Sequence, residues 1–160
     1  MAVNNQRIDE LIAKLLETAR ADPATNWFDA VADDAIASAE SSLDIILPEI
    51  LKHCYTRISN GEFGPGYQLT GLPGGHHSSW GDLVQTTSEL RRHDECEDEW
   101  LPLIDWGCAQ FTIVDCTDEQ IVTLYEGDFH CEDYTLVTLF EKWTIGEVPN
   151  LARGTFHRIG

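Results

Sequence analysis

Basic residues are scarce in this sequence. Ten lysines and arginines stand against 28 aspartates and glutamates among 160 residues, which gives a formal net charge of −18. A chain of this charge repels phosphate groups and has few cations with which to displace counterions, so DNA, RNA and anionic membranes are disfavoured as partners. The same charge favours a basic protein partner, because opposite charges accelerate the encounter of two proteins.

Long apolar runs are also missing. No stretch approaches the ~20 apolar residues that a membrane-spanning helix needs, and residues 1–16 contain no apolar run of signal-peptide length. The five cysteines are an odd number at irregular spacings, which predicts reduced thiols and no disulfide framework. We therefore expect a cytoplasmic protein without membrane contact.

The chain lacks the common motifs of catalysis and cofactor binding. The glycine-rich segments 61–67 and 71–75 fit neither a phosphate-binding nor a dinucleotide-binding pattern, and no lysine follows them. The pair His76-His77 is accompanied by no nucleophile elbow, and carboxylates are too abundant to single out an acid–base pair. We expect no enzyme activity, no catalytic residue and no cofactor.

A zinc site is the remaining chemical alternative. Structural zinc sites usually pair their ligands at short spacings such as C-x₂-C, and this chain has no such pair. The sequence therefore favours the absence of a metal. The ligands of a zinc site would be His93, Cys96, Cys108, Cys116, His130 and Cys131.

Apolar residues recur at helical spacing in several segments. Ser79, followed by Asp82, resembles the capping box that begins a helix, and Pro48 suits a first helical turn. Cys54 falls on the inner face of its helix and is expected to be an inert core thiol. Helices are expected at Asn5–Arg20, Asp33–Leu43, Pro48–Ser59, Ser79–Arg92 and Asp133–Trp143.

Strands are expected in the second half of the chain. Trp100–Tyr125 has the pattern of three short strands, of which the last two form a hairpin through the turn Cys116–Glu119. A further short strand is expected at Tyr67–Gly71, whereas Gly146–Gly160 has no clear periodicity. Helices on both sides of a group of strands predict an α+β fold.

Several aromatic side chains have two interpretations. Trp80 and Trp100 begin predicted elements beside acidic residues, and tryptophan is common in protein interfaces. Partial burial against the domain is the simpler interpretation of both. Trp27, with Phe28 and Val31, is expected to pin the connection after the first helix to the core.

Three segments in a fixed order resemble a known family. Residues 47–61 read Leu-Pro, then a helix, then Asn-Gly; residues 101–107 read LPLIDWG; and residues 139–143 read LFEKW. This order is similar to that of the SUKH superfamily, in particular its Smi/Knr-type branch. The resemblance implies a central antiparallel or mixed, twisted sheet with helices towards both ends of the chain.

The resemblance covers about residues 33–146 of a single domain at 1–160. Residues 1–32 would be a helical extension and residues 147–160 a tail. Many bacterial members of the superfamily are immunity proteins, which bind toxins and carry no catalytic constellation. The resemblance therefore implies a non-catalytic protein-binding module, and the alternative is a regulatory or scaffold protein of the same fold without a toxin partner.

The acidic residues are concentrated in the predicted strand region. Between Asp82 and Asp133 the chain has 15 acidic residues and only two basic ones, Arg91 and Arg92. A solvated surface selected for solubility would explain this, but the resemblance favours a surface that binds a basic toxin domain, for example a nuclease. The sequence indicates no oligomeric state. The residues predicted to contact the partner are Glu97, Asp98, Asp105, Asp115, Asp118, Glu119, Glu126 and Asp128.

Overall fold

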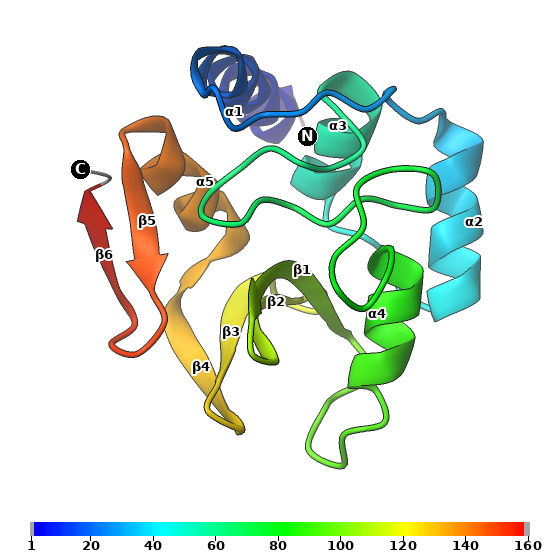
Figure 1. Cartoon of the computed structure of the whole chain (residues 1–160). Helices are drawn as coiled ribbons and strands as arrows, with labels where there is room; N and C mark the ends of the chain where they lie inside the picture. Colours follow the sequence, from blue (N-terminus) through cyan, green and yellow to red (C-terminus); the bar gives the residue numbers. More distant parts are fainter. Residues whose placement is uncertain (1, 159–160) are drawn as a thin grey trace.

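The structure is a computed structural model that describes residues 2–158, with side chains for residues 5–158. Within this range it has five helices and six strands (Figure 1). The helices are α1 (Ala2–Ala21), α2 (Asp33–Leu43), α3 (Glu49–Arg57), α4 (Leu83–Leu90) and α5 (Leu136–Thr144). The strands are β1 (Trp100–Gly107), β2 (Gln110–Asp115), β3 (Gln120–Tyr125), β4 (Asp128–Thr135), β5 (Glu147–Asn150) and β6 (Thr155–Arg158).

Four strands form an antiparallel sheet in the order β1-β2-β3-β4, and β5 and β6 form a separate antiparallel hairpin. Consecutive strands are therefore neighbours throughout. The predicted α+β fold is confirmed, and of the two sheet types expected, the antiparallel one is present.

The first three strands of this sheet are buried on both faces, whereas β4 is mostly exposed. In the β2–β3 ladder Val114 pairs with Ile121, and the next pair is Ile113 with Val122. Since neighbouring residues of a strand point to opposite faces, the first pair joins the main core with the helices. The second pair joins a smaller cluster that contains Trp100. Trp100 is 7% exposed, so its burial against the domain is confirmed.

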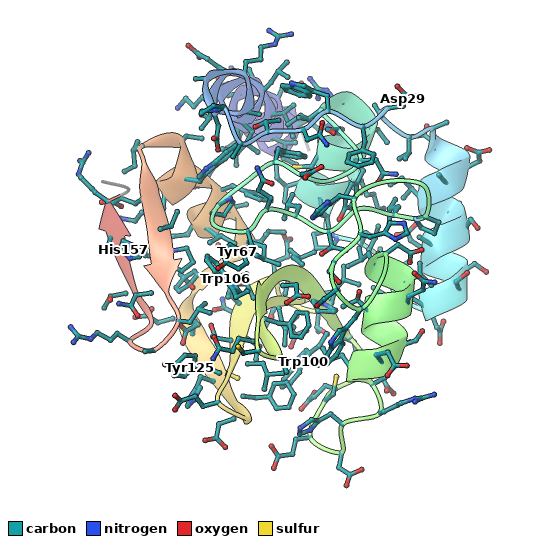
Figure 2. The ribbon with its side chains drawn as sticks, in the orientation of Figure 1. Asp29, Tyr67, Trp100, Trp106, Tyr125 and His157 are labelled. Carbon is teal, nitrogen blue, oxygen red and sulfur yellow. The ribbon has the colours of Figure 1, made fainter. Side chains whose placement is uncertain are left out.

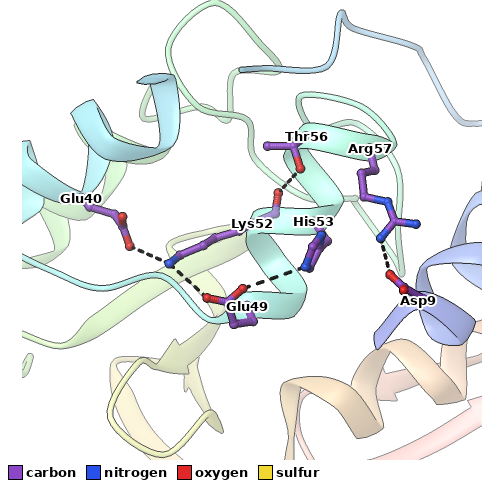
Figure 3. A network of polar contacts seen from close by, with 7 residues as sticks. All are labelled: Asp9, Glu40, Glu49, Lys52, His53, Thr56 and Arg57. Atoms are coloured by element: carbon purple, nitrogen blue, oxygen red, sulfur yellow. Dashed lines mark hydrogen bonds and ion pairs between the residues drawn. The ribbon is translucent and has the colours of Figure 1, made fainter. Parts of the chain in front are cut away.

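The helices surround the main core, and α3 is tied to its neighbours by ion pairs. Lys52 lies 3.5 Å from Glu40 of α2 and 3.3 Å from Glu49 of its own helix, and Arg57 lies 2.6 Å from Asp9 of α1 (Figure 3). Burial by itself would lower the pKa of Lys52, but the two carboxylates outweigh that effect and raise it. Lys52 is therefore held in its charged form between α2 and α3.

The long connection between α3 and α4, residues 58–82, is packed into the domain and crosses its centre in Figure 1. Asn60 is 3% exposed; its side chain accepts a hydrogen bond from the Leu72 amide at 2.7 Å and donates one to the Leu72 carbonyl at 3.2 Å. Gly71 and Gly75 pack so closely on Asn60 that an added Cβ would lie 2.3 Å from its atoms. The connection therefore has a defined conformation that is packed against the core.

Two local predictions in this connection are wrong. No strand forms at Tyr67–Gly71, because Gln68 has a φ of +75° and only Thr70 bonds to β1, through the Leu103 carbonyl at 2.8 Å. The fourth helix begins at Leu83 and is capped by Asp82 and not by Ser79, since Asp82 accepts a hydrogen bond from the Gln85 amide at 3.0 Å. Ser79 bonds Asp105 instead.

The C-terminal third differs from the expectation in two places. The predicted helix Asp133–Trp143 starts only at Leu136, after Thr135 as its cap, because the preceding residues form β4. The tail, for which no element was expected, forms the β5–β6 hairpin. In the N-terminal part, Trp27 is 48% exposed and does not pin its segment to the core. Val31 does, since it packs against the core and its amide bonds the Tyr55 carbonyl at 2.9 Å.

Among residues 2–158, every helix is too short or too polar to span a bilayer.

Candidate functional site

The antiparallel meander of strands β1 to β4 separates the predicted contact residues into two groups. Because Trp100 pairs with Asp115 at one end of the β1–β2 ladder and Gly107 pairs with Gln110 at the other, alternate turns lie at opposite ends of the sheet. At roughly 3.3 Å per residue, an eight-residue strand separates these ends by roughly 20–25 Å. Three predicted residues lie at the second end, namely Asp105, Glu126 and Asp128.

The other five predicted residues lie together at the first end. We call this group the acidic end; it consists of Glu97, Asp98, Asp115, Asp118 and Glu119. The Cys116 amide donates a hydrogen bond to the Glu99 carbonyl at 2.9 Å, which holds the approach to β1 against the end of β2. The β2–β3 turn follows directly, so the loop and the turn lie at the same end of the sheet.

The carboxylates of the acidic end have no ion-pair partner within the described residues. Within residues 5–158, no Lys, Arg or His side chain lies within 4.0 Å of a carboxylate of any of the eight predicted residues. The two basic residues of the region bond other groups, although Arg91 contacts the acidic end through a backbone carbonyl. Arg91 donates to the Leu43 and Asp98 carbonyls, each at 2.7 Å, and Arg92 lies 3.6 Å from Glu89.

Turn geometry fixes two of these carboxylates. Oδ1 of Asp115 accepts a hydrogen bond from the Thr117 amide at 2.9 Å, and Oδ1 of Asp118 accepts one from the Gln120 amide at 3.0 Å. Aspartate side chains stabilise turns in this way, by accepting a hydrogen bond from the backbone amide two residues further along the chain. Both side chains are therefore positioned before any partner arrives, which lowers the entropic cost of binding.

Glu119 is the most perturbed carboxyl of the acidic end. It has a φ of +64° in the turn, and its backbone carbonyl accepts a hydrogen bond from the Leu136 amide at 2.9 Å. Partial burial, and then the charge of Glu49 on α3, raise the pKa of Glu119. A cation placed beside this carboxyl would favour its charged form and so oppose both effects.

A groove of about 550 Å³ adjoins Glu119 between α1, α3, α5 and the β2–β3 turn. Its apolar lining comes from Ile8, Leu11, Ile50 and Val137. Three carboxylates, those of Glu49, Asp118 and Glu119, and one cation, Arg7, also line it. Glu49 could not be predicted as part of this surface, because only the fold brings it to the β2–β3 turn. Its position in the first turn of a helix is a common place for an acid and gave no functional signal.

The second end of the sheet uses its acids differently. Asp105 accepts hydrogen bonds from the Ser79 amide at 3.2 Å, the Ser79 hydroxyl at 2.5 Å and the Gly107 amide at 2.8 Å. This carboxylate therefore joins β1 to the long connection 58–82. Glu126 and Asp128 flank the exposed β3–β4 turn at Gly127.

Three of the five thiols lie in surroundings that disfavour the reactive thiolate, whereas Cys108 and Cys131 are exposed. Cys54 is fully buried and burial raises its pKa, in keeping with an inert core thiol. Burial also raises the pKa of Cys96 to about 11 and that of Cys116 to about 12. Among the described residues, no three His, Cys, Asp or Glu side chains are grouped as a metal site.

Comparison with known proteins gives one finding. No curated protein matches the sequence. The model of the SMI1 / KNR4 family (SUKH-1) matches residues 30–143, from just before α2 to the end of α5. This match covers most of the chain and includes all three segments that carry the resemblance, and it supports an immunity-protein-like domain. The chain belongs to the SMI1 / KNR4 family (SUKH-1).

Proposed function

We propose that this protein is a non-catalytic immunity protein that acts in the cytoplasm and neutralises a cognate bacterial toxin through the acidic end. The observation that supports the proposal most directly is the set of five carboxylates at one end of the sheet without a basic side chain within 4.0 Å among residues 5–158. Family membership supports a domain of this general kind.

The expected partner is a basic toxin domain, for example a nuclease. Lys and Arg side chains that hold phosphate in such an enzyme would find carboxylates of the acidic end in place of phosphate oxygens. Charge-assisted hydrogen bonds of this kind are short and strong, and close interfacial charge pairs contribute about 1.5–7 kcal/mol in coupling energy. Occlusion of the toxin's active site requires no bond to be made or broken.

The test begins with the isolation of the partner by co-purification from the native host and its identification by mass spectrometry. The acidic end is then neutralised with Glu97→Gln, Asp98→Asn, Asp118→Asn and Glu119→Gln. A matched control removes two Glu and two Asp charges from exposed positions on α1, the following connection and α2. Its changes are Glu10→Gln, Glu17→Gln, Asp29→Asn and Asp34→Asn.

We expect the first variant to bind the toxin at least about 100-fold more weakly and with a reduced dependence on salt, whereas the control stays within a few-fold of the parent. Equal effects of the two variants would refute the acidic end as the binding surface. A partner that is not a toxin would instead identify the regulatory or scaffold alternative.

A further inference from the structure

A cleft of about 490 Å³ opens beside Tyr67, between the long connection 58–82 and the end of β1. We call it the Tyr67 cleft. It lies at the second end of the sheet, away from the acidic end, and within the described residues no Lys or Arg lines it. Its aromatic, imidazole and carboxylate lining consists of Tyr67, His76, His77, Glu62 and Asp105, beside the polar side chains of Gln68 and Ser79.

Tyr67 is exposed but held in place. Its side chain is 64% exposed, and its ring lies 5.6 Å from that of Trp106 at an interplanar angle of 31° (Figure 2). Gly66 packs against the same indole so closely that an added Cβ would lie 1.9 Å from it. The chain is also held on the C-terminal side of Tyr67, because the Gln68 side chain donates a hydrogen bond to the Ala24 carbonyl at 2.9 Å.

An aromatic ring presented in this way is typical of a binding anchor. Tyrosine is enriched among the residues that dominate interface energy, and little side-chain freedom is lost when it is already ordered. A ring whose only role was to cover the core would be expected to lie buried. The exposure of Tyr67 on a rigid support therefore points to a ligand.

Two carboxylates give the cleft its charge. Glu62 is 24% exposed; its Oε2 accepts a hydrogen bond from the Asn26 amide group at 2.9 Å and lies 3.6 Å from Nδ1 of His76. Oε1 of Glu62 has no hydrogen bond to another described residue. Asp105 is fixed by its bonds to Ser79 and Gly107. An aromatic surface and two oriented carboxylates thus face one space.

We propose that the Tyr67 cleft binds an arginine side chain projected by a protein partner. The planar guanidinium would stack on the Tyr67 ring and donate a hydrogen bond to Oε1 of Glu62. Arginine fits better than lysine, because its flat, weakly hydrated cation both stacks on aromatic rings and forks towards carboxylates. This inference goes beyond the proposed function, since it concerns the other end of the sheet and no particular toxin.

The test uses a small probe and the full chain. The peptide acetyl-Gly-Arg-Gly-amide is titrated into ¹⁵N-labelled protein while the indole Nε1–H of Trp106 and the backbone amides of residues 66–68 and 76–79 are followed by NMR. The same peptide with citrulline in place of arginine keeps the shape and removes the charge. We expect saturable shifts with arginine and at least about fivefold weaker binding with citrulline.

Substitutions test separately the proposed stacking on Tyr67 and the proposed hydrogen bond to Glu62. Tyr67→Leu should weaken binding of the arginine peptide about two- to fivefold, as expected for loss of an exposed cation–π contact, whereas Tyr67→Phe should retain it. Glu62→Gln should weaken it as well. Tyr125→Leu and Glu126→Gln, at the β3–β4 turn, are matched controls and should bind as the parent does, and the amide spectrum of each variant verifies its fold.

Three results would overturn the inference: no saturable shift with the arginine peptide, equal binding of the arginine and citrulline peptides, or unchanged binding after both Tyr67→Leu and Glu62→Gln. Equal binding of a lysine peptide would overturn the choice of arginine. Since the probe contains no toxin, a negative result here does not affect the proposal for the acidic end. A negative result of the toxin experiment likewise does not affect the proposal for the Tyr67 cleft.

Discussion

Asn60 organises the long connection 58–82 from a single buried side chain. Its amide group bonds both the amide and the carbonyl of Leu72, and its own carbonyl accepts a hydrogen bond from the His76 amide at 3.0 Å. An asparagine after a helix is easily taken as a simple stop signal. The structure shows that it also supplies the hydrogen bonds that a segment without helix or strand needs when it is buried.

We predict that Asn60→Ala lowers the free energy of unfolding by about 1–3 kcal/mol, because it leaves buried backbone groups of Leu72 unsatisfied. Asn26→Ala is the control, since Asn26 is exposed and its side chain bonds only the Glu62 carboxylate in the described structure. Urea unfolding of both variants measures the difference. Equal losses in the two variants would contradict the role given to Asn60.

Glu119 yields a pH-dependent prediction. Because the fold raises the pKa of this carboxyl, the unfolded chain ionises first as the pH rises, and stability is lost through and above the ordinary carboxyl range. Glu119→Gln removes this loss. We expect the variant to be more stable than the parent at about pH 7 and to match it at about pH 3, where both states are protonated.

Urea unfolding at the two pH values measures this difference. Glu126→Gln removes the same charge at an exposed turn position and should show a much smaller change with pH. A constant difference between Glu119→Gln and the parent at both pH values would show that the side-chain amide, and not the charge, is responsible.

At the scale of elements, helices and strands were predicted correctly where apolar residues recur with a strong periodicity. The helices at Asp33–Leu43 and around residues 5–20, and the three strands of Trp100–Tyr125, have apolar residues at regular spacing. Strand β4 was missed because only Tyr134 of its eight residues is buried, so no alternation is visible. The β5–β6 hairpin was missed because its strands are four residues long.

Helix α4 tests the sequence signal for a helix start. Asp82 and Gln85 form a reciprocal capping box, in which the Asp82 amide also donates to Oε1 of Gln85 at 2.9 Å. Asp82→Ala should therefore cost about 0.5–2 kcal/mol in the free energy of unfolding. Ser79→Ala, at the position first expected to be the cap, is the control.

The serine variant removes only a contact to Asp105 at an exposed position. Chemical denaturation with circular dichroism at 222 nm would detect the loss of helix stability. A larger loss for Ser79→Ala than for Asp82→Ala would contradict the assignment of the cap.

At the scale of the whole molecule, the charge was predictable and its arrangement was not. The excess of acid and its concentration after Asp82 can be counted in the sequence. Which carboxylates meet depends on strand direction: the antiparallel meander places Asp118 and Glu126 at opposite ends, although only eight positions separate them. The contribution of Glu49 and the shape of the Tyr67 cleft likewise depend on contacts between distant segments.

A net charge of −18 predicts a salt effect on stability. Repulsion among carboxylates opposes the compact state, and salt screens it over about 10 Å at 0.1 M. We expect the free energy of unfolding to rise between roughly 10 mM and 200 mM sodium chloride, more steeply for the parent than for the variant with a neutralised acidic end. Stability that falls with salt would indicate that the ion pairs of α3 dominate instead.

The packing of the long connection has a consequence for the evolution of this domain. Insertions within residues 58–82 would displace Asn60 and the glycines fitted against it, whereas the hairpin tips at 107–109 and 126–127 are exposed and already adopt left-handed backbone. A lineage that exchanges one binding partner for another would therefore be expected to lengthen or recharge these tips and to leave the long connection unaltered.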